Sequence, residues 1–231
     1  MTINKKKGNW NFGKGVPEKF DNHIQKSVPF YNEIHRLIVD ISSFFLFNNT
    51  NCLDIGCSTG SLFKKMHNNI GYKKIQYIGI DREIEMIKFA KKNNKNSQFK
   101  FLKKNIYSYN TKIKFSLVTS IFTIQFLNPS LRQNVFNKIY NYLDYGGAFI
   151  YFEKIRGNDA RFQDILNGLY SDFKKKQKLS PSHILNKSES IRGILEPFTD
   201  KANQDFLLRA GFSDIQTIFQ FLCFKGYLCI K

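Results

Sequence analysis

The sequence of 231 residues has few cysteines, few acidic residues and no long apolar run. Its four cysteines form no C-x-x-C pair and have no histidine at the spacing of a zinc site, so we expect buried thiols and no bound metal. The longest apolar stretch, near 38–47, is interrupted by Asp40, Ser42 and Ser43 and is too short to cross a membrane. No apolar signal region follows the early lysine run at 5–7. We therefore expect a cytoplasmic protein with no membrane partner.

Basic residues outnumber acidic ones, with 36 Lys and Arg against 18 Asp and Glu and a formal net charge of +18. Of the basic residues, 29 are Lys and only 7 are Arg, and they are spread over every segment. One interpretation is compositional drift, with lysines on solvated faces. The other is attraction to anionic substrates or RNA, to be tested first at the lysine clusters 91–95, 103–104 and 174–176.

Apolar runs of strand length alternate with segments of helical periodicity from residue 52 onward. The expected strands are 52–55, 75–80, 98–102, 115–121, 148–152, 213–219 and 221–230. The expected helices are 61–66, 83–94, 129–143, 158–178, 188–195 and 203–210. Two further helical patterns between 20 and 47 are separated at 27–29, with Pro29 at the first helical position of the second. This alternation, closed by a hairpin, predicts an α/β fold: a Rossmann-like, doubly wound sheet of seven strands with helices on both faces.

We divide the chain into a lead-in and helical lid at 1–47 and a Rossmann-like domain at 48–231, with a helical insertion at about 158–196. The lid precedes the first strand, so it is placed to cover a ligand at the edge of the sheet. Tyr31 would then face that ligand. The alternative is a core tyrosine whose hydroxyl is hydrogen-bonded.

The segment 52–60 has the pattern of a ligand-binding turn between a buried strand and a helix. Asp54 ends the apolar run, and Gly56 and Gly60 allow a tight turn that a ligand can approach closely. The start of the following helix offers unpaired N–H groups to an anion. A second strand pattern ends at Asp81, where doubly wound folds hold the two ribose hydroxyls of a nucleoside.

The turn favours S-adenosylmethionine (SAM) over a dinucleotide. The dinucleotide fingerprint needs a third glycine that this turn lacks, and Asp54 would repel a pyrophosphate. SAM instead brings an ammonium group for Asp54, a carboxylate for the helix start and a ribose for Asp81, with no phosphate. An ordinary strand-turn-helix of an α/β protein remains the alternative at this point.

Several longer motifs resemble the class I SAM-dependent methyltransferases, and nearly the whole chain resembles the carboxy-SAM synthase family. The motifs are Ser27-Val28-Pro29 with Tyr31, Asp54 to Ser58, Phe122 to Leu127, Gly146-Gly147-Ala148, Glu153-Lys154, Asp172-Phe173-Lys174 and Ala210-Gly211-Phe212. The resemblance implies SAM contacts at Tyr31, Gly56, Cys57, Ser58, Asp81, Arg82, Asn105 and Ile106. It also implies a homodimer, and a reaction that moves carbon dioxide from prephenate to the activated methyl of SAM for tRNA wobble-uridine modification. An arginine of the family holds the new carboxylate.

The chain departs from the family pattern at three positions. Asn105 replaces an aspartate at the adenine edge, and its amide oxygen can still accept a hydrogen bond. Ile121, also expected at the cofactor, replaces an asparagine. Ser188 stands where the carboxylate-binding arginine is expected, and Arg192 follows one helical turn later. A desolvated carboxylate without its charged partner loses roughly 1.5 to 3 kcal/mol, which removes the preference for carboxy-SAM over SAM.

Methyl transfer from SAM to an unidentified acceptor, a small molecule or tRNA, is therefore the leading hypothesis. Carboxy-SAM synthesis is the second, and a catalytically silent SAM- or RNA-binding module is the third. A general base is needed only if the acceptor is protonated, and the candidates are Glu153, Tyr31 and His183. The alternatives are an ion pair of Glu153 with Lys154 or Arg156, a packed Tyr31 and an exposed loop position for His183.

Overall fold

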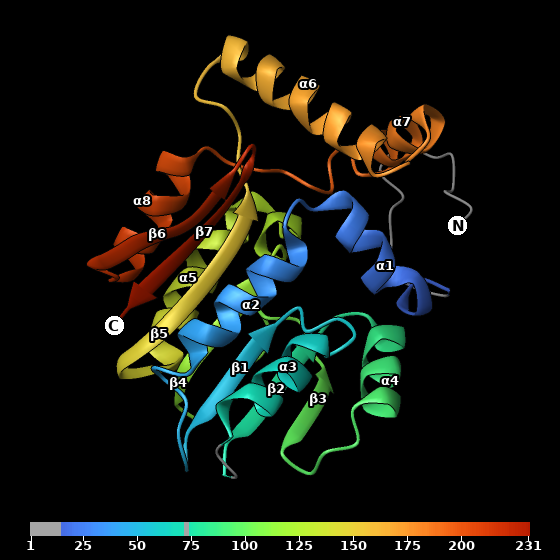
Figure 1. Cartoon of the computed structure of the whole chain (residues 1–231). Helices are drawn as coiled ribbons and strands as arrows, with labels where there is room; N and C mark the ends of the chain where they lie inside the picture. The colour runs from blue at the N-terminus through green and yellow to red at the C-terminus, as the bar shows by residue number, and fades with distance from the viewer. Residues whose placement is uncertain (1–14, 72–73) are drawn as a thin grey trace.

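The computed structural model describes residues 15–71 and 74–231, so most of the predicted lead-in lies outside the described residues. Its core is one seven-stranded sheet in the order β3-β2-β1-β4-β5-β7-β6 (Figure 1). The strands are β1 (Asn51–Ile55), β2 (Gln76–Asp81), β3 (Phe99–Lys103), β4 (Phe115–Ile121), β5 (Leu143–Lys154), β6 (Asp214–Phe221) and β7 (Phe224–Ile230). Strands β1 to β5 pair in parallel, and the β6–β7 hairpin adds to β5 in antiparallel register. The predicted sheet and its terminal hairpin are confirmed.

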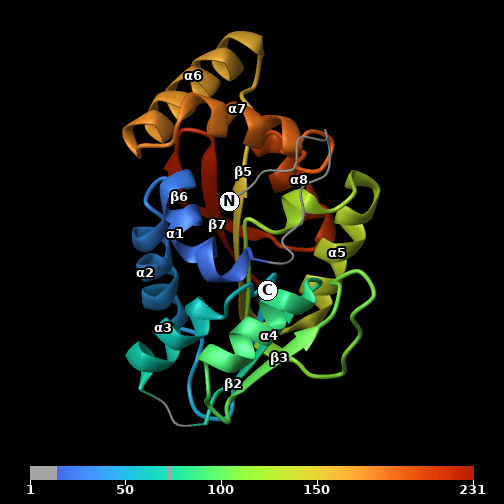
Figure 2. The same cartoon turned by 90° about the vertical axis from the view of Figure 1, so that its right-hand side faces the viewer.

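Helices cover both faces of this sheet, as the two views in Figures 1 and 2 show. They are α1 (Pro17–Ser27), α2 (Tyr31–Ser42), α3 (Ser61–Ile70), α4 (Ile84–Asn93), α5 (Pro129–Tyr142), α6 (Ala160–Lys176), α7 (Pro181–Ser190) and α8 (Asp200–Ala210), with a 3-10 turn, η1, at Ile124–Phe126. Within the described ranges, none of these helices combines the length and the apolar character needed to span a bilayer.

Two apolar cores fill the space between the sheet and these helices. On one face α2, α3 and α4 bury Ile34, Phe63 and Ile87 against the sheet. On the other, α5 and α8 bury Phe136 and Leu207. Strands buried on both faces are expected to be almost continuously apolar, which is the pattern of β1, β2 and β4. The helix α2, which we assigned to the lid, is thus an integral part of the first core.

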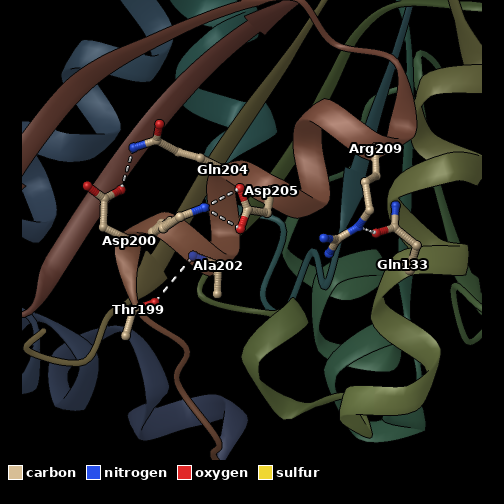
Figure 3. Close-up of polar contacts among 8 residues, drawn as sticks. Gln133, Thr199, Asp200, Ala202, Gln204, Asp205 and Arg209 are labelled. Carbon is tan, nitrogen blue, oxygen red and sulfur yellow. Dashed lines mark hydrogen bonds and ion pairs between the residues drawn. The ribbon is translucent and has the colours of Figure 1, made fainter.

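Polar contacts fix α8 at its start and against α5 (Figure 3). The Thr199 hydroxyl accepts the backbone N–H of Ala202 and caps the helix. Lys201 pairs with Asp205 one turn later at 2.9 Å. Near the other end, Arg209 Nε donates to Gln133 Oε1 of α5 at 2.7 Å (Figure 3). These contacts hold the segment after α7 against the body of the molecule.

The structure corrects three predicted boundaries. A helix was expected at 188–195, but α7 runs over Pro181–Ser190, because Ser180 caps it and proline is well suited to the first helical position. Strand β5 begins at Leu143, although the strand was expected only from residue 148, and the pairing of β4 with β5 shifts its register between Phe115 and Leu117, opposite the glycine pair 146–147. The second lid helix begins at Tyr31 and not at Pro29.

Candidate functional site

The turn after β1 has the geometry of a close-approach site. Gly56 has φ +78°, and a Cβ there would overlap the Thr123 side chain. The backbone N–H groups of Gly56 and Cys57 both donate to the Ile80 carbonyl oxygen, which ties the turn to β2. Gly60, with φ +73°, caps α3 in the left-handed conformation, and a Cβ there would lie 2.6 Å from the Phe101 ring. Only glycine meets both conditions without strain.

A cavity of about 550 Å³ opens at this turn, at the carboxyl ends of β1, β2 and β4. Ligands of open α/β sheets bind in such a position, and the volume suits a nucleoside-sized ligand. The predicted cofactor residues that line it are Tyr31, Asp54, Gly56, Cys57, Ser58, Asp81, Arg82, Asn105, Ile106 and Ile121. Gly60 is the exception, because it shapes the turn from behind. The structure thus places ten of the eleven predicted cofactor residues in one cavity, and their contact with a cofactor stays a prediction.

Asp54 lies at the base of the cavity and is 4% exposed. Its Oδ1 accepts a hydrogen bond from the Thr119 hydroxyl at 2.7 Å. Burial raises the pKa of Asp54 to about 7, although the Thr119 hydrogen bond opposes the shift, and nearby Asp81 adds to it. A buried carboxylate with this surplus of negative charge is a strong partner for an ammonium group.

Asp81, at the end of β2, organises the neighbouring part of the site. Its Oδ2 accepts from the Ser58 N–H at 3.0 Å, and its Oδ1 accepts from the Glu83 N–H at 2.9 Å. Burial raises the pKa of Asp81, and these two backbone donors oppose the rise. The carboxylate is therefore held in place and has acceptor capacity left for ribose hydroxyls.

The adenine side predicted at Asn105 and Ile106 lies along the same cavity. The Ile106 side chain is buried and apolar, as a surface for a stacked ring requires. Asn105 Oδ1 is near the Tyr107 N–H at 3.4 Å, and Arg82 pairs with Glu83 at 3.1 Å. Together with the two carboxylates, these residues fit SAM: a site for its ammonium, its sugar and its base.

The three candidate bases have different surroundings. Tyr31 and His183 line the cavity, whereas Glu153 does not. The ring of Tyr31 lies 4.4 Å from that of His35, and burial raises its pKa far above the ordinary tyrosine value. His183 lies on α7 and not in an exposed loop; its ring is 5.6 Å from that of His23. Burial lowers the pKa of His183, followed by the effect of Lys187.

Glu153 is a buried side chain of β5 that faces the protein interior. Burial raises its pKa well above the ordinary value, while Arg132 and the backbone N–H groups of Gln125 to Thr123 oppose the rise. In the part of the chain that the structure describes, no salt bridge joins it to Lys154 or Arg156. This environment suits a residue that positions η1 better than one that contacts a substrate.

The sequence named Lys174 within the lysine cluster 174–176, but it did not place Lys174 in the cavity or join it to other lysines there. Lys154, Lys174 and Lys187 line a cationic end of the cavity, together with Tyr170 and His23. These residues come from β5, α6, α7 and α1, so no local pattern places them together. Ser188, at the position of the family arginine, also lines the cavity, and Arg192 is not among the lining residues. No group of three or more metal-binding side chains occurs within residues 15–71 and 74–231.

Comparison with known proteins shows which family the chain belongs to. Residues 52–147 match the model of a methyltransferase domain. A carboxy-S-adenosyl-L-methionine synthase of Staphylococcus epidermidis is 39% identical over 226 residues, which cover 96% of this chain and 97% of the relative. The chain belongs to the carboxy-SAM synthase family. A second member, from Campylobacter lari, is 31% identical over 95% of this chain and 94% of its own length.

Solved structures agree on the fold. Human N-acetylserotonin methyltransferase in complex with SAM has a TM-score of 0.63 and 17% identity, over 94% of this chain and 56% of that one. A SAM-dependent methyltransferase of Clostridium acetobutylicum has a TM-score of 0.62 and 13% identity, over 92% and 96%. The expected class I methyltransferase fold is confirmed. The chain is a transferase of the SAM-dependent methyltransferase class, with SAM as its cofactor or substrate.

Proposed function

We propose that this member of the carboxy-SAM synthase family makes carboxy-SAM from SAM and prephenate. The observation that carries the proposal is the similarity over nearly the full length of relatives that bear this name, which extends through the insertion and the hairpin as well as the nucleotide-binding turn. The cationic end of the cavity supports it, because prephenate is a dicarboxylate and needs positive charge for binding.

The chain's own residues would bind and orient the two reactants. SAM supplies a methyl group that its sulfonium has activated. Asp54 and Asp81 would fix the ammonium and the ribose, so that the methyl group faces the rest of the cavity. Helices α1, α6 and α7 lie over the carboxyl edge of the sheet and would limit the entry of water (Figure 1).

Methyl transfer to another acceptor is the second candidate, and Ser188 favours it. A serine at this position provides no charge for the carboxylate of carboxy-SAM, so an unmodified methyl group would be accepted at least as well. The acceptor would then be a small molecule that reaches the cationic end of the cavity.

The two candidates are separated by incubating the purified protein with SAM and prephenate and analysing the nucleosides by mass spectrometry. For carboxy-SAM synthesis we expect a product that is heavier than SAM by one carbon dioxide unit and that forms only when prephenate is present. SAM that stays unmodified in the presence of intact prephenate would refute carboxy-SAM synthesis. Accumulation of S-adenosylhomocysteine with an added acceptor would instead support methyl transfer.

We further propose a cytoplasmic homodimer that associates through α6. Phe162, Ile165 and Leu169 lie on one face of this helix and are 54%, 52% and 49% exposed. The helix has no buried residue in the single chain and extends beyond the sheet in both views (Figures 1 and 2). A two-fold symmetric pairing of such stripes would remove this apolar surface from water.

A further inference from the structure

Two lysines share one aromatic ring at the cationic end of the cavity. The Lys174 Nζ lies 4.2 Å from the centre of the Tyr170 ring, and the Lys154 Nζ lies 4.6 Å from it. Lys174 and Tyr170 are one helical turn apart on α6, and Lys154 ends β5. A ring face attracts a cation, so Tyr170 holds both ammonium groups beside the cavity.

The Tyr170 ring is itself fixed from two sides. Its hydroxyl donates to the Ser27 carbonyl oxygen of α1 at 2.8 Å. Its ring meets Phe224 of β7 edge-on, with the ring centres 5.2 Å apart. The aromatic support is therefore anchored to both the lid and the sheet, and the lysines it carries have a defined position.

This concentration of positive charge is costly in a half-buried place. Burial, followed by the charge of Lys154, lowers the pKa of Lys174 to about 8, and burial lowers the pKa of Lys187 to about 6. Within residues 15–71 and 74–231, no carboxylate forms a salt bridge with Lys154 or Lys174. A bound anion would remove this repulsion, so the cluster is poised to receive negative charge.

We propose that Lys154, Lys174 and Lys187 form a carboxylate-binding subsite for the second substrate. Lys187 precedes Ser188 on α7 and lines the cavity, whereas Arg192 does not. The subsite rests on the proposed function for the identity of its ligand, prephenate, but not for the chemistry of that ligand.

The test is titration calorimetry of the full-length protein, saturated with SAM, against prephenate and against malonate as a simple dicarboxylate. We expect K174Q and K187Q to weaken prephenate binding by roughly 10- to 100-fold, because each removes a hydrogen-bond donor that a bound anion keeps charged. K174R should keep most of the affinity. SAM binding should be the same in all of these proteins.

The matched control is K175Q on the same helix. Lys175 is exposed, pairs with Asp172 at 3.2 Å and does not line the cavity, so its replacement should leave prephenate binding unchanged. Equal weakening by K175Q would indicate a general charge effect and would overturn the subsite. So would wild-type affinity in both K174Q and K187Q.

The outcomes also separate the subsite from the proposed function. Dicarboxylate binding that K174Q and K187Q remove, without formation of carboxy-SAM, supports the subsite and refutes the proposed reaction. Failure of the SAM-saturated wild-type protein to bind either dicarboxylate overturns the subsite. Formation of carboxy-SAM with an unchanged KM for prephenate in both variants keeps the reaction and overturns the subsite.

Discussion

At the scale of single residues, the cavity brings together two carboxylates from adjacent strands, the buried Asp54 and the partly buried Asp81. Asp54 is the penultimate residue of β1, and Asp81 is the last residue of β2. Burial raises the pKa of both, and Asp81 also raises the pKa of Asp54. Folding them side by side costs free energy that a ligand with an ammonium group can return. Both were predictable, because each follows an apolar run in the sequence and parallel strands end at one edge.

Replacement of Asp81 by alanine should weaken SAM binding by roughly 10- to 100-fold, the effect of losing hydrogen bonds to a charged acceptor. Titration calorimetry measures it. The control is Asp205→Asn on α8, which removes only the ion pair between Asp205 and the exposed Lys201. SAM affinity that is equal in D81A and wild type would contradict the assignment of the ribose site.

Asp54 gives SAM binding a defined pH dependence. Its pKa is about 7 in the folded protein, so the carboxylate that attracts the ammonium is lost below that pH. We expect the affinity to fall by about fivefold between pH 7 and pH 6 and to level off above pH 8. D54N should bind more weakly and lose this dependence between pH 6 and pH 8.

The same shift affects stability with the opposite trend. The pKa of Asp54 is higher in the folded protein than in the unfolded one. The contribution of Asp54 to the free energy of unfolding is therefore fully present below about pH 4 and is lost as the pH rises through 7. Thermal unfolding should therefore find D54N more stable than wild type at pH 8, with a smaller difference at pH 4. A constant difference across this range would contradict a raised pKa.

At the scale of elements, the turn between β1 and α3 brings the backbone of Gly56 to Ser58 to the wall of the cavity. Its conformation was predictable from Gly56 and Gly60, since both positions need a positive φ. The boundary of α7 was not, because Ser180-Pro181 both ends one helical pattern and begins the next. The cationic cluster was not predictable either, since its lysines are brought together only when α6 and α7 fold over the end of β5.

Gly56 and Gly71 form a matched pair for testing this turn. Both have a positive φ, but a Cβ at Gly71 would meet nothing within 4 Å, whereas one at Gly56 would overlap Thr123. We expect G71A to lower the free energy of unfolding by about 1 kcal/mol and G56A by about 3 kcal/mol. Denaturant unfolding would measure both. Equal losses would show that the contact with Thr123 does not constrain the turn.

At the scale of the whole molecule, charge is arranged along the cavity. Asp54 and Asp81 lie at the nucleotide end together with Arg82 and Lys104, whereas Lys154, Lys174 and Lys187 lie where β5, α6 and α7 meet the cavity. The chain as a whole carries a net charge of +18. The overall excess of lysine hid this arrangement in the sequence. A ligand with positive charge at one end and negative charge at the other would match the cavity, as the pair of SAM and a carboxylate does.

The α6 stripe makes a prediction about assembly. Light scattering should give the mass of a dimer for wild type and of a monomer for F162E and L169E, because a charge on the stripe opposes its burial. Leu208→Glu is the control, since Leu208 is 54% exposed on α8, away from this helix. A monomeric wild-type protein would rule out the dimer.

The most direct test of the account is the mass of the nucleoside that stays bound when the full-length protein is purified from a host without its own carboxy-SAM synthase. We expect carboxy-SAM, held by Asp54 and Asp81 and retained through Lys154, Lys174 and Lys187. Bound SAM without the added carboxyl group, from a host that makes prephenate, would contradict it.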